Sequence, residues 1–499
     1  MTKLKRILTV GCAVALLTTG LTACKGGKGS IDPDDPVITI MTSAAQPEPA
    51  SEDSPVLEAL EQYLGTRLQI SFIPASGYGE KVTATMGSGE YPMVMLVETK
   101  TASIIQNARG GTFWDITDKI KDSAKYPNLS QANDVVLNNT SIDGKIYGLY
   151  RARTLGRSGM CIREDWLETL GMSMPETMDE FHEVLKAFKE KDPDGNGQAD
   201  TFGMIMTTAS TTLDAMVVWF GAPNKWGEAE DGTLQPDFMF DEYFECLKFL
   251  RTLYEEELIN QDFATYDGAK WDEQFLSSRA GVIIDVADRS RRIAENMAKS
   301  TPKAKVGVIG YVKRDAGSEA RTLPTSGWKG FYVFPKPAVP QESDLDFILD
   351  KMDKMNDQEA LNLMNFGIKG RHYEIEEDGF AKISEDTSIG KEYADLNQVA
   401  TGIIETQLKK RYSTDVAEKA DIVMKDNEKY IVSNPAEPLV SDTYSMKGPQ
   451  LDEIISSANT KFIVGKIDEA AYKKEIEKWR SQGGDEYIKE INDAYNALK

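Results

Sequence analysis

The sequence predicts an α/β protein with open mixed sheets flanked by helices, and it predicts that the chain forms at least two lobes. From residue 37 onward, apolar runs typical of strands alternate with amphipathic stretches typical of helices. A second series of such segments begins near Tyr147. The 499 residues also exceed what one hydrophobic core holds, since single cores stop growing at roughly 250–300 residues.

The first unit is predicted to run strand, helix, strand, helix, strand. Residues 37–41 are β-branched or apolar, as in a buried strand. Apolar residues between 56 and 64 recur at helical spacing, and Gly65 ends that helix. Residues 68–72 alternate as a second strand does, and 91–97 supply a third. This order predicts a largely parallel sheet, whose ligands bind beyond the carboxyl ends of its strands.

The remainder of the chain continues the alternation. Thr177 and Glu180 form a capping box at the start of a helix. Residues 280–285 and 330–334 are apolar runs that predict later strands. The C-terminal part is helical throughout, and the pair of glycines at 483–484 is expected to break one helix before the next begins.

The N-terminus has the features of a bacterial export signal. Three basic residues among the first six precede an apolar run at 7–17, which is too short for an ordinary membrane span. The following residues 21–24, Leu-Thr-Ala-Cys, resemble the lipobox of bacterial lipoproteins. We therefore expect residues 1–23 to be removed, Cys24 to carry lipid such as palmitate, and 24–36 to form a flexible tether. The alternative is an ordinary secretory cleavage site with an incidental cysteine.

The composition argues against some classes of partner. The formal net charge is −23, and three of the positive charges lie in the expected signal peptide. Such an acidic chain is a poor candidate for nucleic acid or anionic lipid, and its charge counts weakly against polyanionic ligands. Cys161 and Cys246 lie outside the N-terminal segment. They are either two buried thiols or a disulfide, because sequence spacing does not show whether they approach.

The chain lacks the sequence signatures of common enzyme mechanisms. It has only two histidines and no nucleophile elbow, zinc-binding His-Glu-x-x-His motif, phosphate-binding loop or dinucleotide fingerprint. We therefore expect a binding protein without catalytic residues. Two alternatives remain open: a lipid-anchored glycoside hydrolase, whose paired carboxylates would be visible only in space, and a surface adhesin.

The sharpest internal motif is the loop at residues 192–200. Its oxygen-bearing side chains are spaced two apart, and Gly197 stands at position 6, where a calcium loop turns sharply. Position 12, which holds a bidentate Glu in an EF-hand, is Gly203 here, so the missing ligand would come from Asp200, Thr201 or elsewhere. The alternative is a solvated polar turn. The expected calcium ligands are Asp192, Asp194, Asn196, Gln198 (through its backbone carbonyl) and Asp200.

Several sequence blocks resemble a known family. They are residues 162–171, 175–188, 254–259, 365–373 and 479–495, and together they span most of the chain after the signal. These blocks resemble the family 1 extracellular solute-binding proteins, in particular the sugar-binding lipoproteins of ABC importers and the related alginate-binding periplasmic proteins. The alginate-binding relatives carry a calcium loop, which implies structural calcium at the loop described above. Thr201 stands where those relatives have an acidic residue, which puts the affinity in doubt more than the location.

The resemblance also implies an architecture and a function. Proteins of this kind have a type II periplasmic-binding-protein fold, in which two lobes joined by hinge segments close around a sugar or oligosaccharide. Closure presents a new surface to membrane permease subunits. We therefore expect a monomer at the extracytoplasmic face of the bacterial cell membrane, held there by lipid alone. The expected boundaries are 37–150 and 295–350 for the first lobe, and 151–294 and 351–499 for the second, which holds the calcium-like loop.

Candidate ligand contacts follow from the chemistry of sugars, whose apolar faces stack on aromatic rings and whose hydroxyls bind charged or amide groups. Trp219, Trp226, Trp271 and Trp328 lie mid-chain, and Trp328 is favoured because it follows a turn. Core packing is the commoner role for any single Trp. The arginines are equally compatible with surface ion pairs. The expected contacts are Tyr78, Tyr150, Arg151, Arg153, Trp219, Asp285, Arg289 and Trp328.

Overall fold

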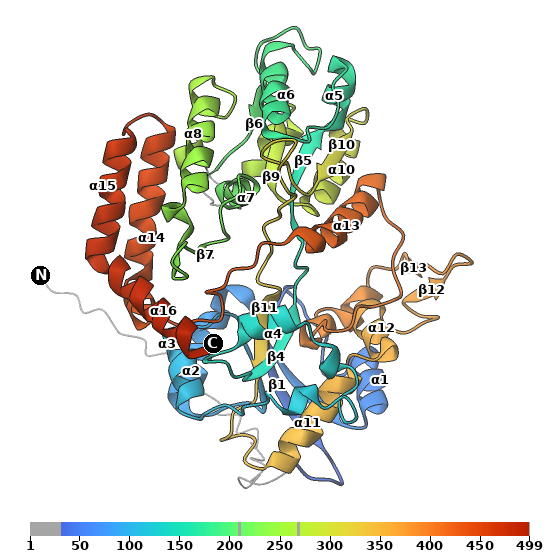
Figure 1. Cartoon of the computed structure of the whole chain (residues 1–499). Helices are drawn as coiled ribbons and strands as arrows, with labels where there is room; N and C mark the ends of the chain where they lie inside the picture. Colours follow the sequence, from blue (N-terminus) through green and yellow to red (C-terminus); the bar gives the residue numbers. More distant parts are fainter. Residues whose placement is uncertain (1–30, 208–210, 267–269, 499) are drawn as a thin grey trace, which may run out of the picture.

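The computed structural model describes residues 31–207, 211–266 and 270–498 of the chain (Figure 1). The expected signal peptide, Cys24 and the first part of the expected tether lie outside these residues. Within them, no helix combines the length and the apolar character needed to cross a membrane. Cys161 and Cys246 are both buried and both free, so they do not form a disulfide.

The first lobe is built on a five-stranded sheet with the order β2-β1-β3-β11-β4. The first three strands in the chain pair in parallel, whereas β11 is antiparallel to both its neighbours, so the sheet is mixed. The strands are β1 (Val37–Ala44), β2 (Arg67–Pro74), β3 (Val94–Val97), β4 (Gly148–Ala152) and β11 (Trp328–Val333). The helices of this lobe are α1 (Pro55–Leu64), α2 (Tyr78–Ser88), α3 (Ala102–Arg109), α4 (Asp134–Thr140), α11 (Glu342–Lys354) and α12 (Gln358–Phe366).

The second lobe is built on a four-stranded sheet with the order β10-β5-β9-β6, in which only β6 and β9 are parallel. The strands are β5 (Ser158–Arg163), β6 (Phe202–Met204), β9 (Ala280–Val286) and β10 (Val306–Ile309). The helices around it are α5 (Glu164–Leu170), α6 (Met178–Glu190), α7 (Thr211–Trp219), α8 (Asp241–Glu255), α9 (Trp271–Leu276), α10 (Arg289–Ser300) and α13 (Asp415–Asn427).

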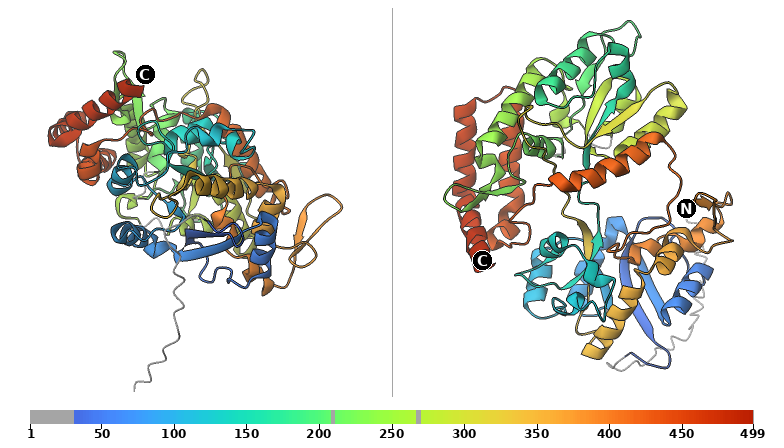
Figure 2. Two further views of the ribbon diagram at one scale, coloured as in Figure 1. Left: turned by 90° about the horizontal axis from the view of Figure 1, so that it is seen from below. Right: turned by 45° about the vertical axis from the view of Figure 1, so that its right-hand side comes forward.

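Smaller elements complete the chain. Two hairpins, β7 (Trp226–Glu228) with β8 (Leu234–Pro236) and β12 (Tyr373–Ile375) with β13 (Ala381–Ile383), project from the lobes. The C-terminal helices α14 (Asp442–Ile463), α15 (Glu469–Trp479) and α16 (Asp485–Leu498) lie beside α8, and α16 extends toward the first lobe (Figures 1 and 2). α14 and α15 pack on the second lobe, because their side chains Ala458, Phe462 and Tyr472 belong to its core.

Local chemistry explains why these elements begin and end where they do. The Ser54 hydroxyl accepts hydrogen bonds from the backbone N–H groups of Val56 and Leu57 at the start of α1, and Gly65 ends the helix at a φ of 67°. The first strand and the first helix are therefore confirmed. The Thr177 hydroxyl likewise accepts from the Glu180 N–H at 3.3 Å, which confirms the predicted cap of α6.

The predicted break in the C-terminal helices is also confirmed. Gly483 adopts a φ of 136° in the turn Arg480–Gly484, between α15 and α16. A side chain at Gly484 would stand 2.1 Å from the ring of Trp479, so glycine is also needed there for close packing. Beyond this turn, the start of α16 contacts the first part of α14, where Tyr487 lies on Tyr444.

The lobe boundaries differ from those expected from the sequence. β10 lies within residues 295–350, yet it pairs with β5 in the second sheet. Residues 358–366 and 396–399 lie within the span given to the second lobe, yet Leu361 and Leu396 belong to the first core. The reason is that the chain returns to the first lobe only after β10 and stays on it past Ile403 and Ile404, up to the Lys409 carbonyl that accepts from the Ala381 N–H.

In the described part of the chain, three segments link the two sheets side by side: 153–157, 310–327 and 400–414. They are joined by backbone hydrogen bonds: Arg153 N–H to Gly327 at 2.9 Å, Thr325 N–H to Leu155 at 2.9 Å, and Ala152 N–H to Thr401 at 2.6 Å. The links lie between the lobes in Figure 1. Crossing segments bonded in this way provide a common axis about which the lobes can move.

Candidate functional site

A cavity of about 1160 Å³ lies where the first lobe, the second lobe and the C-terminal helices meet. Lys100 and Ile105 contribute from the first lobe, the segment from Lys225 to Phe238 from the second, and α14 forms a long wall. This volume exceeds the roughly 300–1,000 Å³ of ordinary small-molecule pockets. The cavity can therefore admit a ligand larger than a single small ring.

Aromatic rings form one side of this cavity. Tyr444 stacks on Tyr487 with ring centroids 4.6 Å apart, and the edge of Trp226 meets Tyr487 at 5.0 Å. Phe238 and Trp479 form a second edge-to-face pair at 5.0 Å. Two features place Tyr444 over Tyr487: Ser441 caps α14 just before Tyr444, and the glycine turn changes the direction of the chain between α15 and α16. Tyr444 is 38% exposed, and a flat aromatic ring of this kind can pack on the apolar face of a sugar.

Charged and hydrogen-bonding groups stand between the rings. The Lys225 ammonium pairs with Asp214 at 2.7 Å, and the Tyr444 hydroxyl donates to Asp452 at 2.8 Å. Burial raises the pKa of Asp237 to about 7, although Lys225 opposes the shift. A carboxyl group whose pKa lies this far from its ordinary value is common at functional sites.

Lys100 closes the first-lobe side of the cavity. Its ammonium donates to the backbone carbonyls of Asn139 (2.9 Å), Ser141 (3.4 Å) and Glu437 (2.9 Å). Burial lowers the pKa of this ammonium to about 8. Because Glu437 precedes α14 and the other two carbonyls belong to the first lobe, Lys100 ties the C-terminal helices to that lobe.

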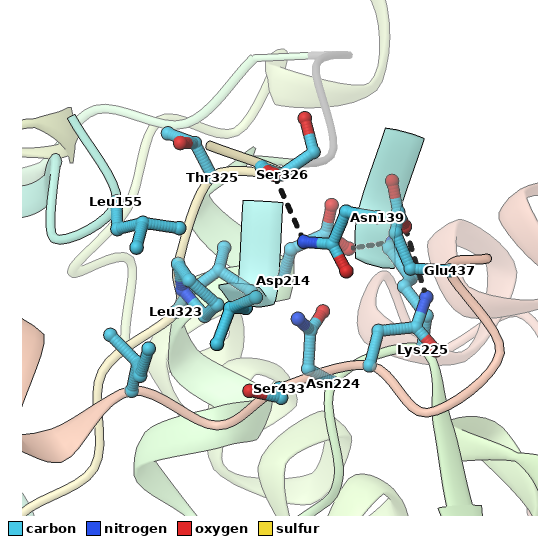
Figure 3. A pocket seen from close by; sticks show the side chains of 14 residues that line it. Asn139, Leu155, Asp214, Asn224, Lys225, Leu323, Thr325, Ser326, Ser433 and Glu437 are labelled. Atoms are coloured by element: carbon cyan, nitrogen blue, oxygen red, sulfur yellow. Dashed lines mark hydrogen bonds and ion pairs between the residues drawn. The ribbon is translucent and has the colours of Figure 1, made fainter. Parts of the chain in front are cut away.

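A smaller pocket of about 220 Å³ opens beside the crossing segments and shares Asp214, Lys225 and Glu437 with the large cavity (Figure 3). The Asn139 side-chain amide donates to the Ser326 carbonyl at 2.9 Å. Polar side chains from both lobes and from the crossing segments thus converge here. A ligand in the large cavity would lie next to the segments that must bend when the lobes move.

The ligand contacts expected from the sequence lie elsewhere, and none of them lines either cavity. Tyr78 is 1% exposed, and its hydroxyl lies 2.9 Å from the Leu96 carbonyl. The Tyr150 hydroxyl accepts from the Asn133 N–H at 2.8 Å inside the same core. Trp219 is 2% exposed in the core of the second lobe. Each of these three side chains packs the interior of a lobe, and as ligand contacts they stay predictions.

The remaining expected contacts lie nearer the surface, but most of them already form ion pairs, hydrogen bonds or ring contacts within the protein. Arg289 forms ion pairs with Asp285 and Asp272, both at 2.6 Å, and lies over the ring of Trp271. Arg151 is 9% exposed and donates to the side chain of Gln398. Trp328 packs edge-on against Phe331, and Arg153 is exposed at the start of the first crossing segment. As ligand contacts, Arg151, Arg153, Asp285, Arg289 and Trp328 stay predictions.

Most residues that line the large cavity were not predicted from the sequence. Trp226 is one of the four mid-chain tryptophans, but it is not among the eight expected contacts. Tyr444 and Tyr487 lie 43 positions apart and meet only because of the glycine turn, so no local pattern identifies them. The recurrence of aromatic residues next to charged ones, as in Lys225-Trp226 and Asp237-Phe238, was the available signal.

The calcium-like loop lies apart from these cavities, after α6. The Asp192 carboxylate accepts from the N–H groups of Asn196 (3.2 Å) and Gly197 (2.9 Å). The Asn196 side-chain amide donates to Asp194 at 2.9 Å and to Asp200 at 3.2 Å, so it stands between two carboxylates. Partial burial, together with Asp192 and Asp200, raises the pKa of Asp194. The loop therefore gathers negative charge around one centre.

Two observations count against the loop as a preformed metal site. In the described residues, no group of three or more His, Cys, Asp or Glu side chains is positioned to hold a metal ion. The Thr201 hydroxyl donates to the Phe188 carbonyl at 2.7 Å in the interior, so it does not face the loop. The donor chemistry nevertheless suits calcium, which binds oxygen ligands. Convergence on an ion would require the Asn196 side chain to turn its oxygen inward.

Comparison with known proteins places this architecture in a family. The profile of the bacterial extracellular solute-binding proteins matches residues 44–327. This chain belongs to that family. The solute-binding protein is 42% identical over 476 residues to lipoprotein LipO of Bacillus subtilis, covering 93% of each chain. It is 32% identical to the polygalacturonan/rhamnogalacturonan-binding protein YtcQ of the same species, covering 99% of each.

Solved structures share the fold at low sequence identity. An HMO-binding, ABC-transporter-associated solute-binding protein from Bifidobacterium longum infantis superposes with a TM-score of 0.69 at 19% identity, covering 93% of this chain and 99% of that one. An EF-hand mutant of the substrate-binding protein FusA of Streptococcus pneumoniae, in complex with fructo-nystose, gives 0.62 at 17% identity over 93% and 99%. The two-lobed fold predicted from the sequence is therefore confirmed, and the family consists of binding proteins, not enzymes.

Proposed function

We propose that this solute-binding protein captures an oligosaccharide in the large cavity between its lobes and delivers it to the permease of an ABC importer. The observation that carries the proposal is the cavity lining, where stacked aromatic rings alternate with carboxylates, hydroxyls and amides. Sugars need this combination, because their apolar faces pack on rings and their hydroxyls bind polar groups. The relatives YtcQ, named for polysaccharide binding, and FusA, solved with a bound fructo-oligosaccharide, support the same class of ligand.

The contacts that we assign to the ligand are Trp226, Tyr444 and Tyr487 for stacking, with Asp237 and Asp452 for hydroxyl groups. They come from the second lobe and the C-terminal helices packed on it, so a ligand would be held there first. Lys100 and Ile105 on the first lobe would then complete the enclosure. This order suits a protein that captures its ligand while open and closes afterwards.

The proposal is tested by incubating the purified protein with a panel of neutral and acidic oligosaccharides. We expect a rise in melting temperature with at least one of them and no new products by chromatography, since binding to the folded state stabilises it. Tyr487→Ala should abolish the rise, whereas Tyr495→Phe, farther along α16, should preserve it. Steady release of shorter sugars would identify a glycoside hydrolase instead. An adhesin would bind immobilised polysaccharide but show no response to soluble oligosaccharides.

We further propose that lipid on Cys24 holds the protein at the outer face of the cell membrane. The lipobox-like residues 21–24 motivate this assignment, and the name of lipoprotein LipO agrees with it. Cys24→Ser should release the protein from membranes in an otherwise unchanged folded form. Mass spectrometry of the protein from native membranes checks the modification directly, and an unmodified Cys24 would contradict it.

A further inference from the structure

The charges around the large cavity point to a narrower class of ligand. In its described lining, five acidic residues stand against three lysines, and no arginine is present. Arginine is the residue that binds sugar carboxylates most effectively, because its planar fork makes two parallel hydrogen bonds to them. A ligand that carries a carboxylate on each ring would therefore be repelled by the negative charge of the cavity lining.

Two of the three lysines are already committed to protein partners, and Lys225 neutralises only one of the five acids. Lys225 forms an ion pair with Asp214 at 2.7 Å. Lys100 already donates to three backbone carbonyls, which use all its N–H groups. Neither ammonium can turn to an incoming carboxylate without giving up those partners. Lys461, on α14, is the remaining cation of the described lining.

Two guanidinium groups outside the cavity are similarly occupied. Arg289 bridges Asp285 and Asp272 at 2.6 Å, and Arg157 pairs with Asp288 at 2.8 Å. Each of these arginines is therefore neutralised by an aspartate of its own lobe. Neither fork can reach toward an acidic sugar without breaking its ion pair.

The carboxylate of Asp452, in contrast, can accept hydrogen bonds from the hydroxyl groups of a sugar. Asp452 takes one hydrogen bond from the Tyr444 hydroxyl and has acceptor capacity to spare, and Tyr444 offers its ring beside it. A pair of vicinal hydroxyls can donate to such a carboxylate while the sugar ring packs on the tyrosine. Resting on the proposed function, we infer that the cavity selects a neutral oligosaccharide of several rings and rejects polyuronates.

This preference would distinguish the chain from one of its relatives. YtcQ, which is 32% identical, is named as a binder of polygalacturonan and rhamnogalacturonan. Both names denote polymers that contain galacturonate. The cavity described here would accept neutral sugars and exclude those acidic chains, so the two proteins would take up different fragments.

Titration calorimetry of the purified protein tests this inference with matched ligands. The probes are trigalacturonate, its fully methyl-esterified form, and neutral trisaccharides and tetrasaccharides of galactose, arabinose, xylose and glucose. We expect a neutral probe to bind at least about tenfold more tightly than trigalacturonate, with little dependence on salt. Tighter binding of trigalacturonate, strengthened at low salt, would overturn the inference but leave the proposed function standing. If no probe binds, the proposed function itself fails.

A variant at Asp452 tests whether the acidic residues of the cavity bind the ligand. Asp452→Asn keeps the size of an exposed side chain but weakens its acceptor, so the neutral ligand should bind about tenfold less tightly. Asp118→Asn, at an exposed position in the first lobe, serves as the matched control and should bind as the parent does. Equal affinity of the Asp452 and Asp118 variants would remove Asp452 from the ligand site.

Discussion

Asp237 has its carboxyl group buried in the wall of the cavity, where only 7% of the residue is exposed. Its pKa is about 7 in the folded protein, against an ordinary value of 3.8. The folded state therefore keeps a proton that the unfolded state releases between about pH 4 and pH 7. Because the folded state binds more protons in this window, the free energy of unfolding should fall as the pH rises through it.

Asp237→Asn cannot titrate, so the part of that fall due to Asp237 should vanish. A shift of this size corresponds to at most about 4 kcal/mol, since one pKa unit is about 1.4 kcal/mol. Chemical denaturation at pH 4.5 and pH 8 should show the variant gaining stability over the parent only at the higher pH. Asp118→Asn should track the parent at both values, and an Asp237 variant that did the same would refute the assigned burial cost.

The tryptophans show what the sequence could and could not predict at this scale. Trp219 and Trp226 are seven positions apart; Trp219 has apolar neighbours, whereas Trp226 stands between Lys225 and Gly227. Trp219 ends α7 inside the core, whereas Trp226 starts the hairpin strand β7 that reaches the cavity. Helical or strand periodicity does not show which of two tryptophans lines a cavity, because that depends on how segments distant in the sequence pack together.

At the scale of elements, the loop at 192–200 supports a separate prediction. We propose that Asp192, Asp194, Asn196, Asp200 and the Gln198 carbonyl bind calcium, because their oxygens gather in one turn that concentrates negative charge. Bound calcium would replace the repulsion between the carboxylates with attraction.

Calcium at about a hundred times its dissociation constant should raise the free energy of unfolding by about 2.7 kcal/mol. Chelation should lower the melting temperature accordingly, and Asp194→Ala should remove most of that difference. Magnesium should substitute poorly, since it demands a tighter octahedron. Ligand affinity should change less, because the loop is remote from the cavity. Unchanged melting after chelation, with no metal in elemental analysis, would leave the loop as a polar turn.

Most elements could be predicted because their signals are local. The cap at Ser54–Gly65 and the glycine break at 483–484 follow from hydrogen bonds and backbone angles within a few residues. The capping box at α6 shows the limit of this reasoning. The Glu180 carboxylate accepts from the Glu176 N–H at 2.8 Å, one residue before the Thr177 cap, so the reciprocal bond is displaced.

At the scale of the whole molecule, the expected closure around the ligand leads to a measurable change in shape. Arg109 on α3 lies 3.6 Å from Asp442 at the start of α14, close to the link made by Lys100. These contacts already hold the C-terminal helices near the first lobe. Closure around a ligand in the large cavity would therefore be a further approach of the two lobes about the three crossing segments, starting from a molecule in which this side is already bridged.

Small-angle scattering should show a smaller radius of gyration when a ligand identified by melting shift is saturating. A sugar that gives no melting shift is the control and should leave the scattering unchanged. Arg109 also pairs with Asp143 at 2.8 Å, and both of its ion pairs are largely exposed, so Arg109→Ala should cost only about 1 kcal/mol of stability. Identical scattering with and without a bound ligand would mean that this protein binds without closing.

The lobes themselves were predictable from length and from the alternation of strands and helices, but their boundaries were not. β10 and β11 are both short apolar strands, and nothing local indicates that one pairs with β5 and the other with β3. Pairing between strands distant in sequence depends on the global fold. The sequence therefore predicted the kind of architecture, and the structure was needed to locate the crossings.

The place of β11 has a consequence for how this chain can be made. β11 lies between β3 and β4 in the first sheet, although the chain reaches it only at residue 328. During synthesis from the N-terminus, β3 and β4 would therefore each lack a neighbouring strand until about two thirds of the chain had been made. Such late, non-local pairing slows folding and leaves those edges open to wrong partners. The first sheet therefore stays incomplete for most of the synthesis of the chain. Until β11 has been made, the chain needs protection from aggregation.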